Sequence, residues 1–429
     1  MTSDVSTTAP KVHVAIDVAK LTHQVLMELP NGKRRVIRVA NTKADLDRLI
    51  AMLRALDHPC EVAFEPTGDY HRPLAYVLAQ AGCRIRFVSS LAVARTREAL
   101  YNTWDKNDPK DAQVILHLLK HGTTQPYVDP FLSGYQDLQE LANTYQQVSL
   151  RKVRLQHSLV THYLPLYFPE AERYLHSSRA EWFTDLLLFT PCPAAVRRYS
   201  KTAFIAAATA QVAGRKVDKA RWLADFYETA GGSVGVPVAP DSEAMRMFRV
   251  VLEEFRALCQ RRRELEAAIV TRLQDQRDFV RLQTVPGIGP ILALIILAEA
   301  RDLRRFGCVR QFLKYCGLDL CTEQSGQFRG TTHLSKRGNA RLRYAFWMAG
   351  TVAIRMRQNS FRRKFESYIR PDPANPDRRR KAYTAVAAKM ARVVYTLIKT
   401  GTDYRRFPEA TRPGGRIPSL GAVEAQATS

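Results

Sequence analysis

Four acidic residues in the first quarter of the chain have the type and placement for metal-dependent chemistry on phosphodiesters. Asp17 lies in the middle of Val12–Lys20, whose alternating, β-branched pattern is typical of a strand. Aspartate is depleted in strands, so this carboxylate must reach an open sheet edge, be paired or bind a cation. Glu65 ends another short strand, and Asp108 and Asp111 share one face at the start of a helix. Four carboxylates that converge repel one another unless a hard cation, Mg²⁺ or Mn²⁺, lies between them.

The segment Asp108-Pro109-Lys110-Asp111 also has a purely structural interpretation. Asp108 fits an N-cap, Pro109 the first helical position and Asp111 an acidic third position. Taken alone, this segment favours the plain helix start. Together with the two strand carboxylates in this order, it favours a metal site.

A second reactive group lies in the polar loop Glu323–Gly330, where Ser325 precedes a glycine. A serine that attacks phosphorus needs an exposed position and either cations or a metal to stabilise the charged oxygens. Ser-Gly pairs are common in ordinary turns, and composition alone favours a turn. The cations that follow the loop are Lys336, Arg337, Arg341 and Arg343.

Several further residues are candidate nucleic-acid contacts. Gly287 and Gly289, in the sequence PGIGP before the apolar helix 291–300, place backbone N–H groups at a helix N-terminus, a phosphate site or a simple tight turn. Ser335 is predicted to cap the following helix or to bind a phosphate. The remaining candidates are Arg329, Lys336, Arg337, Arg341, Arg343, Arg378, Arg379, Arg380 and Lys381.

The charge of the chain points to a polyanionic partner. Its formal charge is +24 and its pI is about 10.0, and residues 301–429 carry 27 Lys and Arg against 9 Asp and Glu. Nucleic acid is the first candidate partner and a membrane surface the second. No stretch has the roughly 20 apolar residues of a membrane span, so we expect no membrane-embedded part. The seven cysteines are scattered without a C-x-x-C pair, which favours reduced thiols in a cytoplasm over disulfides or a zinc site.

The elements that must position the acidic residues follow an α/β order. Three strands come first, with Asn31-Gly32 as a hairpin signal between the second and third. Alternating helices and parallel strands follow, which is the order of an RNase H-like fold. The first and fourth strands are neighbours there, so Asp17 and Glu65 would meet at one rim. The predicted strands are 12–20, 24–29, 34–39, 61–65 and 84–88. The predicted helices are 44–56, capped by Thr42, and 72–81, followed by further helices to about residue 122.

The rest of the chain is predicted to be helical, which makes the fold class α/β plus α. Heptad-like spacing over 138–162 and 251–269 predicts two long helices that pair as a coiled coil, either between subunits or within one chain. The predicted divisions are a disordered tail 1–10, an RNase H-like domain 11–125, a helical coiled-coil region 126–280 with an inserted subdomain 165–240, a serine-bearing domain 281–406 with a helix-hairpin-helix-like segment, and a disordered tail 407–429.

The motifs, in this order, resemble those of the DEDD transposases of the IS110 insertion-sequence family, with its IS1111 branch and the Piv-type DNA invertases. The matching stretches are VAIDVAK, FEPTGDYHRPL, KNDPKDAQVI, TVPGIGPILALIILAEA, FLKYCGLDL, EQSG, SKRGNARLR and VVYTLIKTG. Each is weak alone, and together they cover both end domains.

The resemblance implies a Holliday-junction-resolvase-like DEDD domain joined to a serine-bearing transposase domain. Carried over by motif, the DEDD residues are Asp17, Glu65, Asp108 and Asp111, and the nucleophile is Ser325. It further implies a covalent phosphoserine with DNA and a structured noncoding RNA, a bridge RNA, that pairs with donor and target DNA. It also implies a tetramer whose active sites combine domains of different subunits.

The predicted function is therefore an RNA-guided DNA transposase that works as a homo-oligomer, from dimer to tetramer, and associates with the nucleoid when bound to DNA. Three alternatives stay open. They are a metal-dependent junction nuclease in which water attacks, a site-specific DNA invertase, and a nucleic-acid-packaging protein without catalysis.

Overall fold

The computed structural model of the chain describes residues 10–66, 68–101, 108–175, 181–212, 219–325, 328–357 and 359–405. Of residues 108, 109, 328 and 329, it describes the backbone alone. The chain divides into two compact units, residues 1–137 and 138–429. The first is a mixed α/β unit, and the described part of the second is mostly helical.

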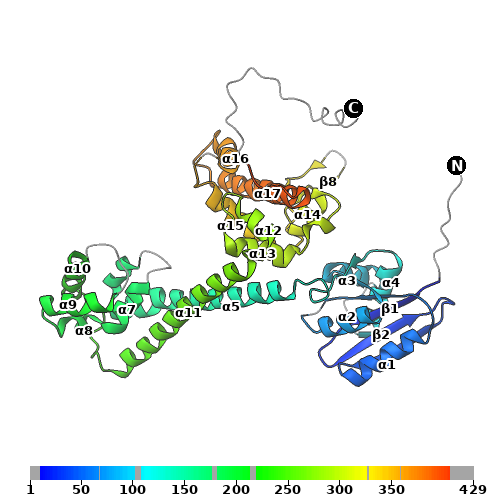
Figure 1. Ribbon diagram of the computed structural model, residues 1–429, viewed down its shortest axis with the longest axis horizontal. Helices are drawn as coiled ribbons and strands as arrows, with labels where there is room; N and C mark the ends of the chain where they lie inside the picture. The colour runs from blue at the N-terminus through cyan, green and yellow to red at the C-terminus, as the bar shows by residue number, and fades with distance from the viewer. Residues whose placement is uncertain are drawn as a thin grey trace, which may run out of the picture. The chain divides into compact units, whose positions relative to one another are not determined.

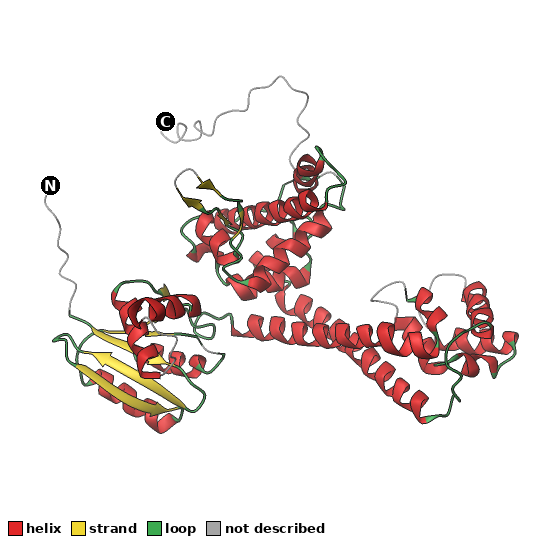
Figure 2. Cartoon of the chain, turned by 180° about the vertical axis from the view of Figure 1, so that it is seen from behind, coloured by secondary structure: helices red, strands yellow, loops and turns green. Residues whose placement is uncertain are grey.

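The N-terminal unit is built on a six-stranded sheet with the order β3-β2-β1-β4-β5-β6. Figure 2 draws strands in yellow. β1, β2 and β3 are antiparallel, whereas β4 and β5 extend the sheet in parallel from β1, as predicted. β6 was not predicted, because two residues at a sheet edge carry no periodicity. The strands are β1 Val12–Asp17, β2 Thr22–Glu28, β3 Arg34–Ala40, β4 Cys60–Phe64, β5 Arg84–Phe87 and β6 Gln125–Pro126.

The predicted hairpin between β2 and β3 is confirmed. Gly32 has a φ of 81°, and its N–H donates to the carbonyl of Leu29 at 2.9 Å. A side chain at this φ is strained, which explains why glycine occupies the turn. The turn sets the register that pairs Glu28 with Arg34.

Helices cover both faces of the sheet (Figure 1). Alternate strand residues face opposite ways, so Val14 and Ile16 pack beneath α1 and α2. Ala15 lies on the other face, beneath α3 and α4. The predicted cap of α1 is confirmed, since the Thr42 hydroxyl accepts from the Asp45 N–H at 3.3 Å. The helices are α1 Lys43–Arg54, α2 His71–Gln80, α3 Ser90–Tyr101 and α4 Asp108–Lys120.

Two long helices, α5 and α11, pair with each other inside one chain. The Tyr145 hydroxyl of α5 donates to Glu266 Oε1 of α11 at 2.9 Å. Further along α5, the Lys152 ammonium lies 5.3 Å from the Phe255 ring centroid. The contacts advance along α5 and retreat along α11, so the helices are antiparallel. The helices are α5 Gln136–Ser158 and α11 Glu243–Leu273.

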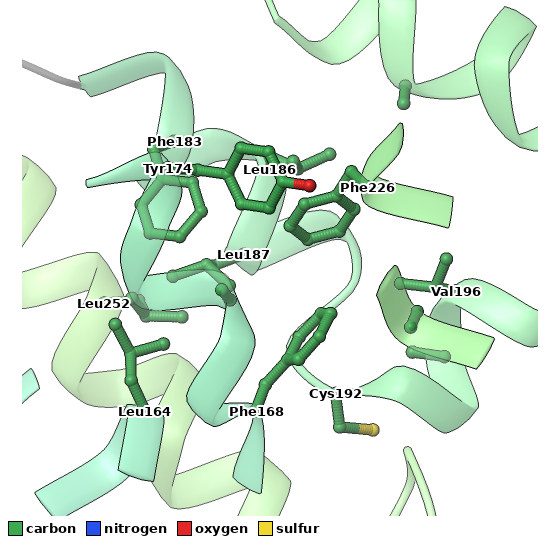
Figure 3. Packing of buried hydrophobic residues seen from close by; sticks show 14 of the residues in the cluster. Leu164, Phe168, Tyr174, Phe183, Leu186, Leu187, Cys192, Val196, Phe226 and Leu252 are labelled. Atoms are coloured by element: carbon green, nitrogen blue, oxygen red, sulfur yellow. The ribbon is translucent and has the colours of Figure 1, made fainter. Parts of the chain in front are cut away.

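The described residues between these helices form short helices, and the hydrophobic core among them also includes residues of α11, such as Leu252 (Figure 3). Phe168, Phe183 and Phe226 are fully buried there. The ring centroids of Phe168 and Phe226 are 5.2 Å apart. Its elements are a π-helix Leu159–Tyr163, α6 Leu164–Tyr167, a 3-10 helix Pro169–Tyr174, α7 Glu181–Phe189, α8 Pro193–Arg197, α9 Lys201–Gln211 and α10 Lys219–Gly231.

The C-terminal part packs short helices around the long helix α17. Gly350 of α15 lets the helices approach closely, because a Cβ there would lie 3.2 Å from Val386 Cγ1 of α17. The helices are α12 Arg277–Gln283, α13 Pro290–Ala300, a 3-10 turn Leu303–Arg305, α14 Val309–Cys316, α15 Ala340–Ala353, α16 Ser360–Ile369 and α17 Pro376–Thr400. The strands are β7 Leu320–Cys321, β8 Gln324–Ser325, β9 Phe328–Arg329 and β10 His333–Leu334. None of the helices in the described parts of the chain combines the length and the apolar character that a membrane crossing requires.

Candidate active site

Asp17 and Glu65 lie beside each other at the ends of neighbouring strands. β1 and β4 are parallel, and their register pairs the residue before Asp17 with the residue before Glu65. Ala15 and Ala63 face the layer of α3 and α4. Asp17 and Glu65 follow them by two residues and therefore belong to the same face. Both acids are half-buried.

Helix α4 brings its acidic first turn toward the same edge of the sheet. Lys120, the last residue of α4, contacts Glu28 with Nζ 2.6 Å from Oε1, and Glu28 pairs with His13 near the start of β1. Going back nine residues from Lys120 to Asp111 covers about 14 Å of helix. The four steps from His13 to Asp17 cover about 13 Å of strand. Asp111 therefore lies at about the level of Asp17.

Asp111 is 4% exposed, and a guanidinium contacts it. Arg97 of α3 donates through Nε to Asp111 Oδ1 at 2.6 Å. A buried carboxylate is costly unless a charge or hydrogen bonds compensate it, and Arg97 supplies both. Arg97 is not predictable from the sequence, because no spacing rule relates it to a carboxylate fourteen residues later.

The acidic residues do not by themselves form a recognisable metal cluster in the described part of the chain. Among the described side chains, which leave out that of Asp108, no three of His, Cys, Asp and Glu could hold a metal ion together. The structure thus places two predicted ligands at adjacent strand ends and a third, Asp111, in the first turn of α4, where Arg97 contacts its carboxylate.

Ser325 lies in a small hairpin of the second unit. It is the last residue of β8 and pairs with Phe328 of the antiparallel strand β9. The ladder of this hairpin continues with the Gly330 N–H, which donates to the Glu323 carbonyl at 2.9 Å. Strands β7 and β10 pair with each other and form the base of the hairpin. The Ser325 side chain is exposed, as a nucleophile for a large substrate must be.

Of the four predicted cations near this hairpin, two are exposed and two have their guanidinium groups bonded to other protein groups. Lys336 and Arg337 are exposed. Arg343 Nη1 donates to the carbonyl of Lys336 at 3.0 Å. Arg341 Nη1 lies 2.7 Å from Glu299 Oε1 and also donates to Asn143, so this predicted nucleic-acid contact has protein partners.

The predicted cap at Ser335 is wrong. The N-cap of α15 is Asn339, whose Oδ1 accepts from the Leu342 N–H at 2.9 Å. Ser335 lies four residues before this cap, too far to reach the free N–H groups of the first turn. Its hydroxyl donates instead to Asp319, so Ser335 fixes the base of the hairpin.

The other predicted contacts lie in separate places. Gly287 has a φ of 88°, and a Cβ there would lie 2.2 Å from the Ala349 carbonyl oxygen, so packing against α15 already requires glycine. Gly289 is the exposed N-cap of α13. Residues 378–381 are exposed near the start of α17, with Arg380 Nη1 2.9 Å from Asp377. The Arg329 side chain is outside the described residues.

The chain matches two transposase family models. Residues 14–169 match a model of the DEDD transposases of IS110, described as "Transposase". Residues 280–366 match a model described as "Transposase IS116/IS110/IS902 family". The two segments contain Asp17, Glu65, Asp108, Asp111 and Ser325.

Relatives and a solved structure were also found. The "Insertion element IS116 uncharacterized 44.8 kDa protein" of Streptomyces clavuligerus is 25% identical over 81% of this chain and 86% of its own length. The "Insertion element IS110 uncharacterized 43.6 kDa protein" of Streptomyces coelicolor is 24% identical over 94% of this chain and 97% of its own. "T. thermophilus RuvC in complex with Holliday junction substrate" aligns at 16% identity with 27% of this chain and 99% of that chain, with a TM-score of 0.20.

These matches define the chain as a DNA transposase, an enzyme of DNA recombination. It belongs to the IS110 family of insertion-sequence transposases.

Proposed function

We propose that this transposase cuts and rejoins DNA with Ser325 as its nucleophile and a divalent metal held by Asp17, Glu65, Asp108 and Asp111. The metal-binding part of this proposal rests on the position of Asp17 and Glu65 at adjacent strand ends, on the face that α4 covers. The observation that supports the serine half is the exposed hydroxyl of Ser325 in a short hairpin of a basic region.

The donor set fits Mg²⁺ or Mn²⁺, because all four side chains offer carboxylate oxygens, the hard ligands that these ions take. A bound Mg²⁺ would stabilise negative charge on the phosphate oxygens during transfer. The strands β1 and β4 hold Asp17 and Glu65 at fixed positions. Arg97 holds Asp111 in place from α3.

The proposed cleavage step is a phosphoryl transfer to serine. Ser325 Oγ forms a bond to phosphorus and loses its proton, and one P–O bond of the DNA backbone breaks. The deoxyribose oxygen that leaves takes up a proton, so charge and atoms balance. Rejoining is the reverse step with the hydroxyl of another strand. Lys336 and Arg337 are the exposed cations that can bind the flanking phosphates.

The remaining parts of the proposal are the partners. Donor DNA, target DNA and a structured guide RNA are all polyanions, which the charge of +24 favours. The acids lie in the first compact unit and Ser325 in the second. That division is compatible with active sites that combine units of different subunits in a tetramer. We propose that the transposase acts in the bacterial cytoplasm and associates with the nucleoid when it is bound to DNA.

The test is a search for a covalent protein–DNA adduct. Protein, Mg²⁺, DNA and the guide RNA from the element's flank are incubated, denatured and separated, and the linked peptide is mapped. We expect an adduct on Ser325 that Ser325→Ala abolishes. The variant should fold normally, because exposed loop substitutions change stability by about 0.5 kcal/mol or less. Cleavage without any adduct would indicate a metal-dependent nuclease in which water attacks.

A further inference from the structure

We propose that a pocket at the base of the Ser325 hairpin binds one unpaired nucleobase of the DNA substrate. We call it the α15 pocket, and it has a volume of about 340 Å³. This is near the lower end of the ~300–1,000 Å³ range of small-ligand sites, so it suits a single nucleotide. The proposal rests on the proposed function only in taking DNA as the ligand. Its main lining residues are Leu318, Leu334, Lys336, Arg343, Tyr344 and Trp347.

Two aromatic side chains form the exposed wall of the α15 pocket. Tyr344 and Trp347 are three residues apart on α15 and are 59% and 41% exposed. Their ring centroids are 6.1 Å apart with an angle of 23° between the planes. Trp347 is supported from behind by Tyr383 of α17, at 6.2 Å. Large aromatic faces beside a pocket are the surfaces on which unstacked bases pack in nucleic-acid-binding proteins.

Two cations, Lys336 and Arg343, also line the pocket, and the Lys336 backbone holds Arg343 in place. The Arg343 guanidinium donates to the carbonyl of Lys336 at 3.0 Å, which fixes its plane at the pocket. Lys336 has a φ of 53°, a strained conformation for a side chain. The neighbouring Gly338 packs so tightly that a Cβ there would lie 2.5 Å from the Gly317 nitrogen. The site is thus preorganised, with an aromatic face for a base and cations for its phosphate.

The composition of the pocket favours a nucleotide over an apolar protein segment. Among the described residues that line it, none is acidic, and the two charged ones are both cations. Leu318 and Leu334 also line the pocket, and Leu334 belongs to β10, which pairs with β7 at the base of the Ser325 hairpin. Strand exchange requires bases to leave their duplex near the cut. A base held here would anchor the strand close to the nucleophile.

The test measures binding of the full-length protein to fluorescent oligonucleotides of one sequence, as single-stranded DNA, duplex DNA and single-stranded RNA. Trp347→Ala and Tyr344→Ala should each weaken single-stranded DNA binding by about 5- to 100-fold, the range of one base–aromatic stack. Trp347→Phe should restore most of it. Tyr368→Ala is the matched control, because Tyr368 is an exposed tyrosine of α16 that does not line the pocket. It should bind as the wild type does.

A salt titration separates stacking from charge. Trp347→Ala should change the affinity and leave the salt slope unchanged, whereas Lys336→Ala should lower the slope by about one. Light-induced cross-linking with 5-iodouracil DNA should give adducts on the peptide that contains Tyr344 and Trp347. These readouts need no catalysis, so they test the pocket even if the serine mechanism fails.

Three results would overturn the proposal. One is wild-type affinity for single-stranded DNA in both aromatic variants. Another is a loss confined to single-stranded RNA, which would make the ligand RNA. The third is a change of oligomeric state in Trp347→Ala, seen by light scattering, with unchanged DNA affinity, which would make the pocket a contact between protein subunits.

Discussion

A buried carboxylate needs a charge beside it, and Asp111 has Arg97. The Arg97–Asp111 pair joins α3 to α4 at the edge where Asp17 and Glu65 end their strands. Arg97 thereby holds a predicted metal ligand in place through its carboxylate. In this role Arg97 is a positioning residue.

The Arg97–Asp111 pair should be important for stability. Arg97→Ala leaves a buried carboxylate unpaired and should lower the free energy of unfolding by about 3–5 kcal/mol. The double variant Arg97→Ala/Asp111→Asn should recover part of that loss, because the uncompensated charge is gone. Urea unfolding measures both.

The matched control is Arg95→Ala, which removes an exposed pair with Glu98 on the same helix, 2.8 Å apart. It should cost less than about 1 kcal/mol. Equal losses in Arg95→Ala and Arg97→Ala would show that burial of Asp111 does not determine the effect.

The four acids should act as one metal site. Asp17→Asn, Glu65→Gln and Asp111→Asn should each abolish DNA cleavage in Mg²⁺, while DNA binding stays within a few-fold of wild type. Asp108→Asn discriminates between the two interpretations of that residue, because asparagine caps a helix about as well as aspartate. Isothermal titration with Mg²⁺ and a gel cleavage assay give the two readouts. Wild-type cleavage by Asp108→Asn would leave Asp108 with the capping role alone.

The reactivity of Cys60, the first residue of β4, should depend on pH. A hydrogen bond from the Cys83 thiol lowers the pKa of Cys60 to about 7. Burial raises the pKa of Cys316 well above its usual value. Since the thiolate is the reactive form, alkylation of Cys60 by iodoacetamide should rise with pH and reach half its maximum near pH 7, while Cys316 stays unmodified. Mass spectrometry of the native protein measures this, and Cys83→Ala should shift the Cys60 midpoint upward.

At the scale of elements, the turn between α12 and α13 shows how packing decides the role of a motif. The sequence PGIGP suggested a phosphate site, yet Gly287 is required by its φ of 88° and by the Ala349 carbonyl of α15. Gly289, two residues later, has no atom within 4 Å of the place that a Cβ would take. Packing and backbone conformation therefore require glycine at position 287, whereas no close contact requires it at position 289.

Gly287→Ala should destabilise the protein far more than Gly289→Ala. The first places a Cβ against backbone atoms and in a strained conformation, which should cost at least about 2 kcal/mol. The second changes only an N-cap preference and should cost about 1 kcal/mol or less. Thermal unfolding of the two variants measures the difference. Similar melting temperatures for both would contradict the close approach of this turn to α15.

At the scale of the whole molecule, the charge should dominate nucleic-acid affinity. If the protein neutralises about 6–10 phosphates, its affinity should fall about 10³–10⁵-fold between 50 and 200 mM salt. Replacing the exposed cations Arg378, Arg379 and Lys381 by alanine should reduce the salt slope by up to about three. Fluorescence anisotropy over a salt series measures it. A slope near zero for the wild type would rule out electrostatic binding.

Much of the fold follows from local patterns in the sequence. Strand alternation in β1 predicts that Val12, Val14 and Ile16 are buried, but not that Ala15 is buried on the opposite face. The Asn31-Gly32 turn and the Thr42 cap have backbone requirements that few residues meet, so both are predictable. The heptad-like spacing of apolar residues in α5 and α11 predicts long helices. It does not show whether they pair within or between chains, because both pairings would bury the same apolar face of each helix.

The sequence by itself determined the basic charge, the first five strands of the sheet, and which acids and which serine are candidates for the site, since each depends on residue type and near neighbours. Only the tertiary structure decided which groups meet across distant segments. In the structure Arg97 contacts Asp111, Arg341 forms an ion pair with Glu299, and the Ser335 hydroxyl donates to Asp319. It also left Tyr344 and Trp347 exposed beside a pocket, although their helical spacing is typical of a core face. The physical reason is that burial and ion pairing depend on packing between elements, which no local pattern records.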